Sequence, residues 1–201
     1  QFLFLLGIFF LPSTLLVGVI FLIPAAIIST IENKNYFFRD IWNKSFFICG
    51  ILITLSAILQ KFFIENEYKN IWDQNLTFLG LANWIPFFWL FWALQTYLKS
   101  QRQIELAALA IVSGTFPVFI SGFGQYFFDW HGPFKFLNGL IIWYQRPIDF
   151  PAGLSGLFSN QNYAGSWLNL AWPFCVAFVI NKSQNILKKT ISINFLVAIG
   201  F

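Results

Sequence analysis

The stretch 129–162 holds the residues of this chain that are best suited to chemistry, and it reads DWHGPFKFLNGLIIWYQRPIDFPAGLSGLFSNQN. Arg146 lies within it, next to Gln145. The planar arginine side chain binds phosphate or carboxylate through two parallel hydrogen bonds. Near membrane depth, an arginine without such a partner is costly. Arg146 therefore predicts either a phosphate clamp, with Gln145 as an accessory residue, or a snorkelling arginine that pairs with Asp129 or Asp149.

Two asparagines follow at the start of an apolar run, in the order Asn160-Gln161-Asn162. Asparagine is a favoured N-cap, so we expect a helix to begin here. The free N–H groups and the positive dipole end of a helix N-terminus attract anions. Arg146 and the Asn160–Asn162 helix start therefore predict a shared pyrophosphate site. The alternative is a simple capped helix entrance.

His131 is the single histidine of the chain and lies two residues after Asp129. It is either a general base or a structural, hydrogen-bonded histidine. A lone histidine without a cluster of cysteines or carboxylates predicts no metal site, and nothing in the sequence calls for a cofactor.

The composition identifies the kind of element that must position these residues. Of the 201 residues, 58% are hydrophobic, 21% are aromatic and only 10% are charged. Soluble domains carry about 25% charged residues. These values exclude a soluble globular enzyme, a disordered chain and a nucleic-acid-binding domain, which needs a dense basic face. They predict a multi-pass membrane protein.

About 20 mostly apolar residues are needed to cross a bilayer as a helix. Five runs meet this length, and a sixth is cut short by the end of the chain. We therefore predict an all-α, polytopic integral membrane helical bundle that forms a single domain over residues 1–201. Because the chain lacks methionine and both of its ends lie inside apolar runs, we expect an internal fragment of a longer protein. The six predicted runs are 2–28, 46–64, 79–98, 104–128, 163–180 and 191 onward.

Three details refine these runs. Pro12 is expected to kink the first run, since proline removes a backbone donor. Ala110 and Gly114 form a small-xxx-small pair that lets another helix approach closely. The aromatic segment 134–144 is expected to form a short helix in the membrane interface, where tryptophan and tyrosine are enriched.

The basic residues predict an orientation, because cytoplasmic loops carry an excess of Lys and Arg. The loops after the first, third and fifth runs hold eight of the 12 cations, and the loops after the second and fourth runs hold the other four. The loop 129–160 is therefore predicted to face outward. The first set is Lys34, Arg39, Lys44, Lys99, Arg102, Lys182, Lys188 and Lys189, and the second is Lys61, Lys69, Lys135 and Arg146.

The outer loop resembles a known signature. Arg146 followed by GLSGLFSNQNYA over 153–164 is similar to the R…G-x-F-x-N-x-N-x-x-A signature of the O-antigen ligase/polymerase superfamily. The passages 38–43, 83–89 and 122–130 resemble cyanobacterial members. The resemblance covers about residues 11–180.

The resemblance implies a multi-pass glycosyltransferase of the bacterial inner membrane. Such enzymes take a glycan from an undecaprenyl-pyrophosphate carrier at the periplasmic face and pass it to a lipid or sugar acceptor without a metal. Arg146 would hold the pyrophosphate, and Asn162 matches the signature asparagine. The larger periplasmic loop of the family lies further toward the C-terminus and is absent here. The catalytic base therefore remains unassigned, and His131 is not given that role.

The resemblance also leaves a second function open, because some cyanobacterial members are labelled inorganic-carbon (bicarbonate) transporters. An ion path needs polar or charged groups near the bilayer midplane. For such a path the second to fifth runs offer a few polar residues, none of them charged, which favours transfer chemistry over transport. Those polar residues are Thr54, Ser56, Gln95, Ser113, Thr115 and Asn169.

Overall fold

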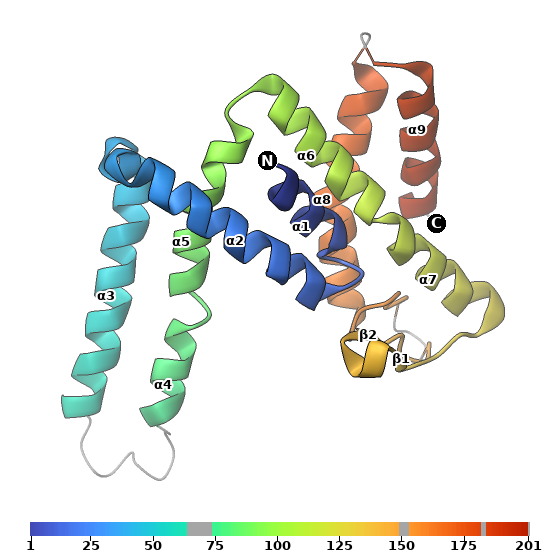
Figure 1. Cartoon of the computed structure of the whole chain (residues 1–201). Helices are drawn as coiled ribbons and strands as arrows, with labels where there is room; N and C mark the ends of the chain where they lie inside the picture. The colour runs from blue at the N-terminus through green and yellow to red at the C-terminus, as the bar shows by residue number, and fades with distance from the viewer. Residues whose placement is uncertain (64–73, 149–152, 182–183, 201) are drawn as a thin grey trace. The chain divides into compact units, whose positions relative to one another are not determined.

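The computed structural model describes residues 1–63, 74–148, 153–181 and 184–200. It is mostly helical (78%), as the apolar runs predict. In chain order its elements are α1 Phe2–Phe10, α2 Leu15–Asn33, η1 Lys34–Arg39, α3 Ile41–Phe63, α4 Gln74–Leu81, α5 Ile85–Leu94, η3 Gln95–Leu98, α6 Gln101–Gly114, α7 Phe116–Phe128, β1 Phe134–Phe136, η4 Leu137–Gly139, β2 Ile141–Trp143, α8 Gln161–Ile180 and α9 Ile186–Gly200 (Figure 1).

Helical segments long and apolar enough to cross a membrane number five among the described residues, in agreement with the predicted count. The third combines α4, α5 and η3, and the fourth combines α6 and α7. The predicted sixth run corresponds to α9, which begins at Ile186. The five segments are Leu15–Arg39, Ile41–Gln60, Leu76–Leu98, Gln101–Phe128 and Gln161–Ile180.

The chain divides into two compact units. Unit 1 consists of Gln1–Ala25 together with Tyr97–Phe201, and unit 2 consists of Ala26–Thr96. Unit 2 is therefore an insertion in the sequence of unit 1. The segment 129–160 and all the predicted site residues belong to unit 1.

The first apolar run is divided at Pro12 into α1 and the start of α2, so a complete break replaces the expected kink. Proline cannot donate the backbone hydrogen bond that would continue the helix. Two glycines let the parts before and after the break approach closely. A Cβ on Gly18 would lie 2.8 Å from the Cα atom of Leu11, and one on Gly7 would lie 2.5 Å from Cγ of Leu22.

The small-xxx-small pair in α6 provides a close helix contact, as predicted. Gly114 is buried, and a Cβ added there would lie only 2.5 Å from the carbonyl oxygen of Phe9 in α1. Only glycine permits this approach of α1 to α6. The Thr115 hydroxyl, immediately after α6, donates to the Ile111 carbonyl over 2.8 Å, and α7 then begins with Pro117 in its first turn.

Helices α6, α8 and α9 build the apolar core of unit 1. Ala108 and Val112 of α6 pack with Cys175 and Phe178 of α8, all four buried. Phe195 is among the partly buried α9 residues against this cluster. Helices α8 and α9 run side by side (Figure 1). This packing fixes α8, whose N-cap is Asn160 and whose first turn contains Asn162.

Aromatic contacts in unit 2 join α5 to α3 and to η1. The rings of Phe46 and Phe88 stack with centroids 5.2 Å apart. Phe37 of η1 meets Trp92 edge to face at 4.7 Å. The buried Ser29 hydroxyl donates to the Ala93 carbonyl over 2.5 Å. Aromatic pairs of this kind contribute about 0.5–1.5 kcal/mol beyond the area they bury.

Candidate functional site

The segment 134–144 forms a small antiparallel hairpin, so the prediction of a short interfacial helix is wrong. Strand β1 pairs with β2, with Phe134 opposite Trp143. The turn places Asn138 at φ 55° and Gly139 at φ 90°. An Asn-Gly pair between β-branched and aromatic residues is a hairpin signal, and it outweighs the apolar pattern that favoured a helix.

Gln145 follows the hairpin and is completely buried, with φ at 38°. Its Nε2 donates to the Ser121 carbonyl of α7 over 2.7 Å, and its own carbonyl accepts from Gly132 N–H at 2.8 Å. Gln145 thereby fixes the backbone that leads into Arg146. Its Oε1 and the Ser121 hydroxyl are buried without a hydrogen-bond partner in the described structure.

Arg146 has an exposed side chain and a backbone that is fixed on both sides. Its N–H donates to the Ser155 hydroxyl over 3.0 Å, and its carbonyl accepts from Nε2 of Gln125. The partner Asp149 proposed from the sequence lies outside the described residues. The structure therefore presents the guanidinium to the surroundings while two polar side chains hold its main chain.

Gln125 of α7 is the centre of this arrangement and is 2% exposed. Besides the Arg146 carbonyl, its Nε2 also donates to the Ser155 hydroxyl at 3.2 Å. Its Oε1 accepts from the Gly156 N–H at 2.9 Å. One side chain thus joins α7 to residues on both sides of the stretch 149–152. We call Gln125, Ser155 and the backbone of Arg146 and Gly156 the amide clamp.

Sequence reasoning missed the role of Gln125. The signal that could have found it is an amide side chain inside an otherwise apolar helix. Buried amides need partners, and such residues are retained where they order irregular backbone. The amide clamp also depends on Gly156, because the φ of +54° at this position favours glycine.

Asn160 caps α8, as the sequence predicts. Its side-chain oxygen accepts from the Tyr163 N–H at 3.0 Å. Asn162 is exposed in the first turn of the helix. The side chains of Arg146 and Asn160 are not joined by a hydrogen bond within the described residues. The amide clamp is what links the two segments: Arg146 bonds to Ser155, and Ser155 precedes Asn160 by five residues.

His131 is exposed, and its Nδ1 lies 2.9 Å from the carbonyl oxygen of Asp129. This contact closes the turn that follows α7, where Asp129 has φ 51°. Beside it, the Trp130 ring packs on Gly124, where a Cβ would lie 2.1 Å from a ring carbon. The structure thus gives His131 a local turn contact. Among the described residues, no three His, Cys, Asp or Glu side chains are grouped as metal ligands.

A pocket of about 750 Å³, which no sequence pattern predicts, lies beside the start of α8. Apolar residues around the Pro12 break, such as Leu15 and Leu16, form part of its wall. The hairpin adds Ile141, and α8 adds Tyr163 and Trp167. The pocket is mainly apolar, and its wall includes Ser159, the residue before the α8 cap.

Two indole N–H groups fix the surroundings of this pocket. Trp143 donates to the Ser13 carbonyl over 2.9 Å, which ties the hairpin to the Pro12 break. Trp167 donates to the Thr115 hydroxyl over 3.0 Å, which ties α8 to the junction of α6 and α7. The pocket wall therefore comes from three segments that are distant in sequence: the Pro12 break, the hairpin and the start of α8.

Comparison with known proteins identifies no relative: no family model matches the chain, and neither the curated proteins nor the solved structures contain a significant match.

Proposed function

We propose that the chain is part of a multi-pass protein of the bacterial inner membrane that transfers a glycan from an undecaprenyl-pyrophosphate carrier to a lipid or sugar acceptor. The proposal combines the signature over 146–164 with the geometry of unit 1. The observation that carries it is an apolar pocket whose wall reaches the capped N-terminus of α8. A lipid-linked pyrophosphate has the matching chemistry, an apolar tail joined to a double anion.

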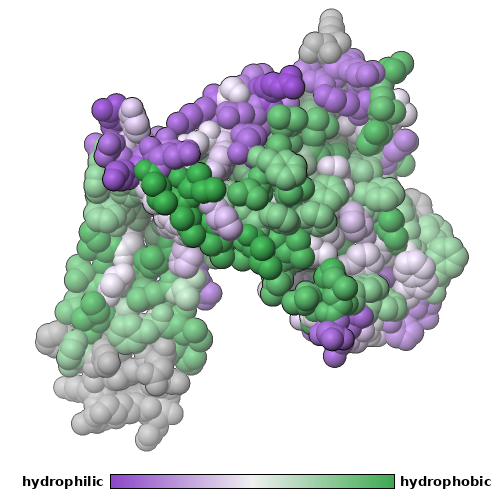
Figure 2. Space-filling model, viewed as in Figure 1, coloured by the Kyte–Doolittle hydropathy of each residue, from purple (hydrophilic) through white to green (hydrophobic). Residues whose placement is uncertain are grey.

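The helices support the membrane placement. Five described segments are long and apolar enough to cross a bilayer, and large apolar side chains lie on their surfaces. In Figure 2 hydrophobic residues cover most of the visible surface of α3 and α5, while hydrophilic residues gather at the η1 end of unit 2. The Lys and Arg counts favour a periplasmic position for the loop 129–160. Two of the counted residues, Lys69 and Lys182, lie outside the described residues.

The transfer step needs few protein groups. An acceptor hydroxyl oxygen attacks the anomeric carbon of the donor sugar, and the bond from that carbon to the pyrophosphate oxygen breaks. The pyrophosphate leaves with the electron pair, and the hydroxyl proton passes to a base that remains unassigned. Arg146 and the α8 N–H groups would stabilise the charge that develops on the leaving group. The amide clamp would hold Arg146 in place for that contact.

The polar residues of the spans favour this reading over bicarbonate transport. The hydroxyls of Thr54, Ser113 and Thr115 each donate to the carbonyl four residues earlier in the chain. Gln95 donates to the Asn43 side chain. Since these groups bond within the protein, they are not free to replace the hydration shell of an anion.

Deletion of the full-length gene tests the proposed class of function. Surface polysaccharide would be profiled on gels, and bicarbonate uptake would be measured in the same strains. We expect lost or shortened glycan chains with normal uptake, restored by the wild-type gene. Normal glycans with impaired uptake would replace the transferase proposal with transport.

A further inference from the structure

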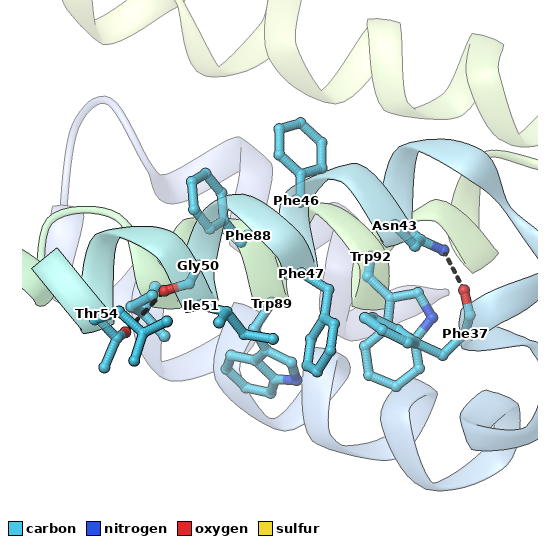
Figure 3. Close-up of a pocket in the computed structure, with 12 residues that line it drawn as sticks. Phe37, Asn43, Phe46, Phe47, Gly50, Ile51, Thr54, Phe88, Trp89 and Trp92 are labelled. Carbon is cyan, nitrogen blue, oxygen red and sulfur yellow. Dashed lines mark hydrogen bonds between the residues drawn. The ribbon is translucent and has the colours of Figure 1, made fainter.

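Unit 2 contains a pocket of its own, of about 430 Å³, between α3 and α5. Half of the residues in its wall are aromatic, and Figure 3 shows their rings arranged along the pocket. Phe37 and Asn43 lie at one end of the pocket, and Thr54 lies toward the other. The principal aromatic residues are Phe37, Phe46, Phe47, Phe88, Trp89 and Trp92.

The polar side chains of α3 in this wall are already paired within the protein. Thr54 donates to the Gly50 carbonyl over 2.8 Å, and Asn43 donates to the Phe37 carbonyl over 3.3 Å (Figure 3). The Asn43 oxygen accepts from Gln95 at 3.3 Å. A polar ligand would lose its hydration here without gaining these partners. The wall therefore fits a hydrocarbon chain.

Gly50 lies in the wall of the pocket. A Cβ on Gly50 would make only ordinary contacts, 3.4 Å from Cδ1 of Ile85 and 3.7 Å from Cδ2 of Phe88. A methyl group is therefore tolerated, whereas a leucine side chain would extend into the pocket. This position offers a way to fill the pocket from within.

Three cations lie close in sequence to the Phe37 and Asn43 end of the pocket: Lys34, Arg39 and Lys44, all exposed. Within the described part of the chain, none of them forms an ion pair. The Arg39 guanidinium lies 4.5 Å from the centre of the Tyr36 ring. The surface around them is therefore available to an anion.

Two carboxylates belong to the same region, Glu32 and Asp40. Asp40 is engaged at the start of α3, where its Oδ1 accepts from the N–H groups of Trp42 at 2.7 Å and Asn43 at 3.4 Å. Its charge is therefore directed at the helix N-terminus. The three cations still outnumber the two carboxylates. Basic residues beside a membrane helix attract anionic lipid headgroups.

We propose that this pocket binds one acyl chain of an anionic phospholipid, whose headgroup phosphate contacts Lys34, Arg39 and Lys44. The chain would lie between the aromatic rings, and the phosphate would lie beyond the Asn43 end. The site is separate from the donor site, since it lies wholly in unit 2. It relies on the membrane placement proposed above and not on the transfer reaction.

Native mass spectrometry of the delipidated full-length protein tests this proposal, with phosphatidylglycerol or phosphatidylcholine as the probe. We expect the first phosphatidylglycerol to bind at least tenfold more tightly than the first phosphatidylcholine. Changing Lys34, Arg39 and Lys44 together to Gln should remove that preference, because each cation contributes about fivefold near an anionic headgroup. Gly50→Leu should weaken both lipids. Gly80→Leu is the matched control, because a Cβ on Gly80 has nothing within 4 Å.

An unchanged preference in the triple Gln variant would overturn the proposal, and so would unchanged binding in Gly50→Leu. If Gly50→Leu fails to fold, the triple variant decides, because its three changes are on the surface. Extraction of native membranes with alkaline carbonate tests the membrane placement of the wild-type protein separately from lipid binding. An integral protein stays in the membrane pellet, whereas release into the supernatant would contradict the placement itself.

Discussion

Unit 1 and unit 2 use buried polar side chains in different ways. In unit 1, Gln125 of α7 bonds to the backbone of a loop, and Gln145 of that loop bonds to the backbone of α7. Together they hold the loop in an irregular conformation. In unit 2, Ser29 and Trp89 join one helix to another, and aromatic rings fill the space between helices. A backbone fixed by amides can present a charged residue in a defined position. Helices that are separated by aromatic rings leave room for an apolar ligand.

The largest expected difference in stability between the two units comes from removing one amide side chain in each. Gln125→Leu leaves the Gly156 N–H and the Arg146 carbonyl without their partner. Each buried, unsatisfied group costs about 1–3 kcal/mol. Gln95→Leu in unit 2 should cost less, because it removes a single long bond of 3.3 Å to Asn43. The midpoint of thermal unfolding in detergent, measured on the full-length protein, gives the comparison. Equal losses of stability in the two variants would show that the amide clamp stabilises the protein no more than the single Gln95–Asn43 bond.

A glycine pair gives the next test. Gly114→Ala should lower the unfolding free energy by about 1–3 kcal/mol, because the new Cβ would meet the Phe9 backbone. Gly50→Ala in unit 2 should be neutral or stabilising by up to about 1 kcal/mol, since alanine favours the helix and the site has room. The same unfolding assay applies. Tolerance of Ala at position 114 would contradict the close approach of α1 to α6.

The cap of α8 should have a smaller effect. Asn160→Ala removes the bond to the Tyr163 N–H and should cost about 1 kcal/mol. Asn162→Ala is the matched control, because Asn162 is exposed and its change should stay within about 0.5 kcal/mol. Hydrogen exchange of the first turn of α8 would show the difference directly. Similar exchange in both variants would argue against the Asn160 cap.

The smallest effect is expected in unit 2. Trp89→Phe removes the indole bond to the Thr30 hydroxyl, at 2.9 Å, and retains most of the ring packing. Side-chain hydrogen bonds between membrane helices contribute about 0.6 kcal/mol on average. Thermal unfolding should shift only slightly. A loss as large as that of Gln125→Leu would show that unit 2 also depends on polar bonds.

The sequence predicted what depends on local chemistry. The five long apolar helical segments follow from apolar length, and the α8 start follows from Asn160. The close helix approach at α6 follows from the Ala110 and Gly114 spacing. A kink is predicted at Pro12, and the structure has a full break at that position, which the close approach at Gly7 and Gly18 allows. In each case the residue acts on neighbours within a few positions or through its own small size.

What the sequence could not predict depends on distant partners. The hairpin over 134–143 is an exception, because its Asn138-Gly139 turn is a local signal that the prediction of an interfacial helix did not use. The role of Gln125 could not be predicted, because its partners Arg146 and Gly156 lie 21 and 31 residues further along the chain. The pocket at α8 combines the Pro12 break, the hairpin and α8 itself. No local pattern encodes such a meeting of segments.

Turnover of a lipid-linked glycan by the purified full-length protein tests the central claim most directly. Arg146→Ala should reduce donor affinity or rate about 10- to 100-fold, since charged hydrogen bonds contribute about 1.5–3 kcal/mol. Arg146→Lys should recover only part of this, because a point charge cannot replace the two-pronged contact. Arg102→Ala, an exposed arginine at the start of α6, should leave turnover unchanged. Full activity of Arg146→Ala would contradict the account.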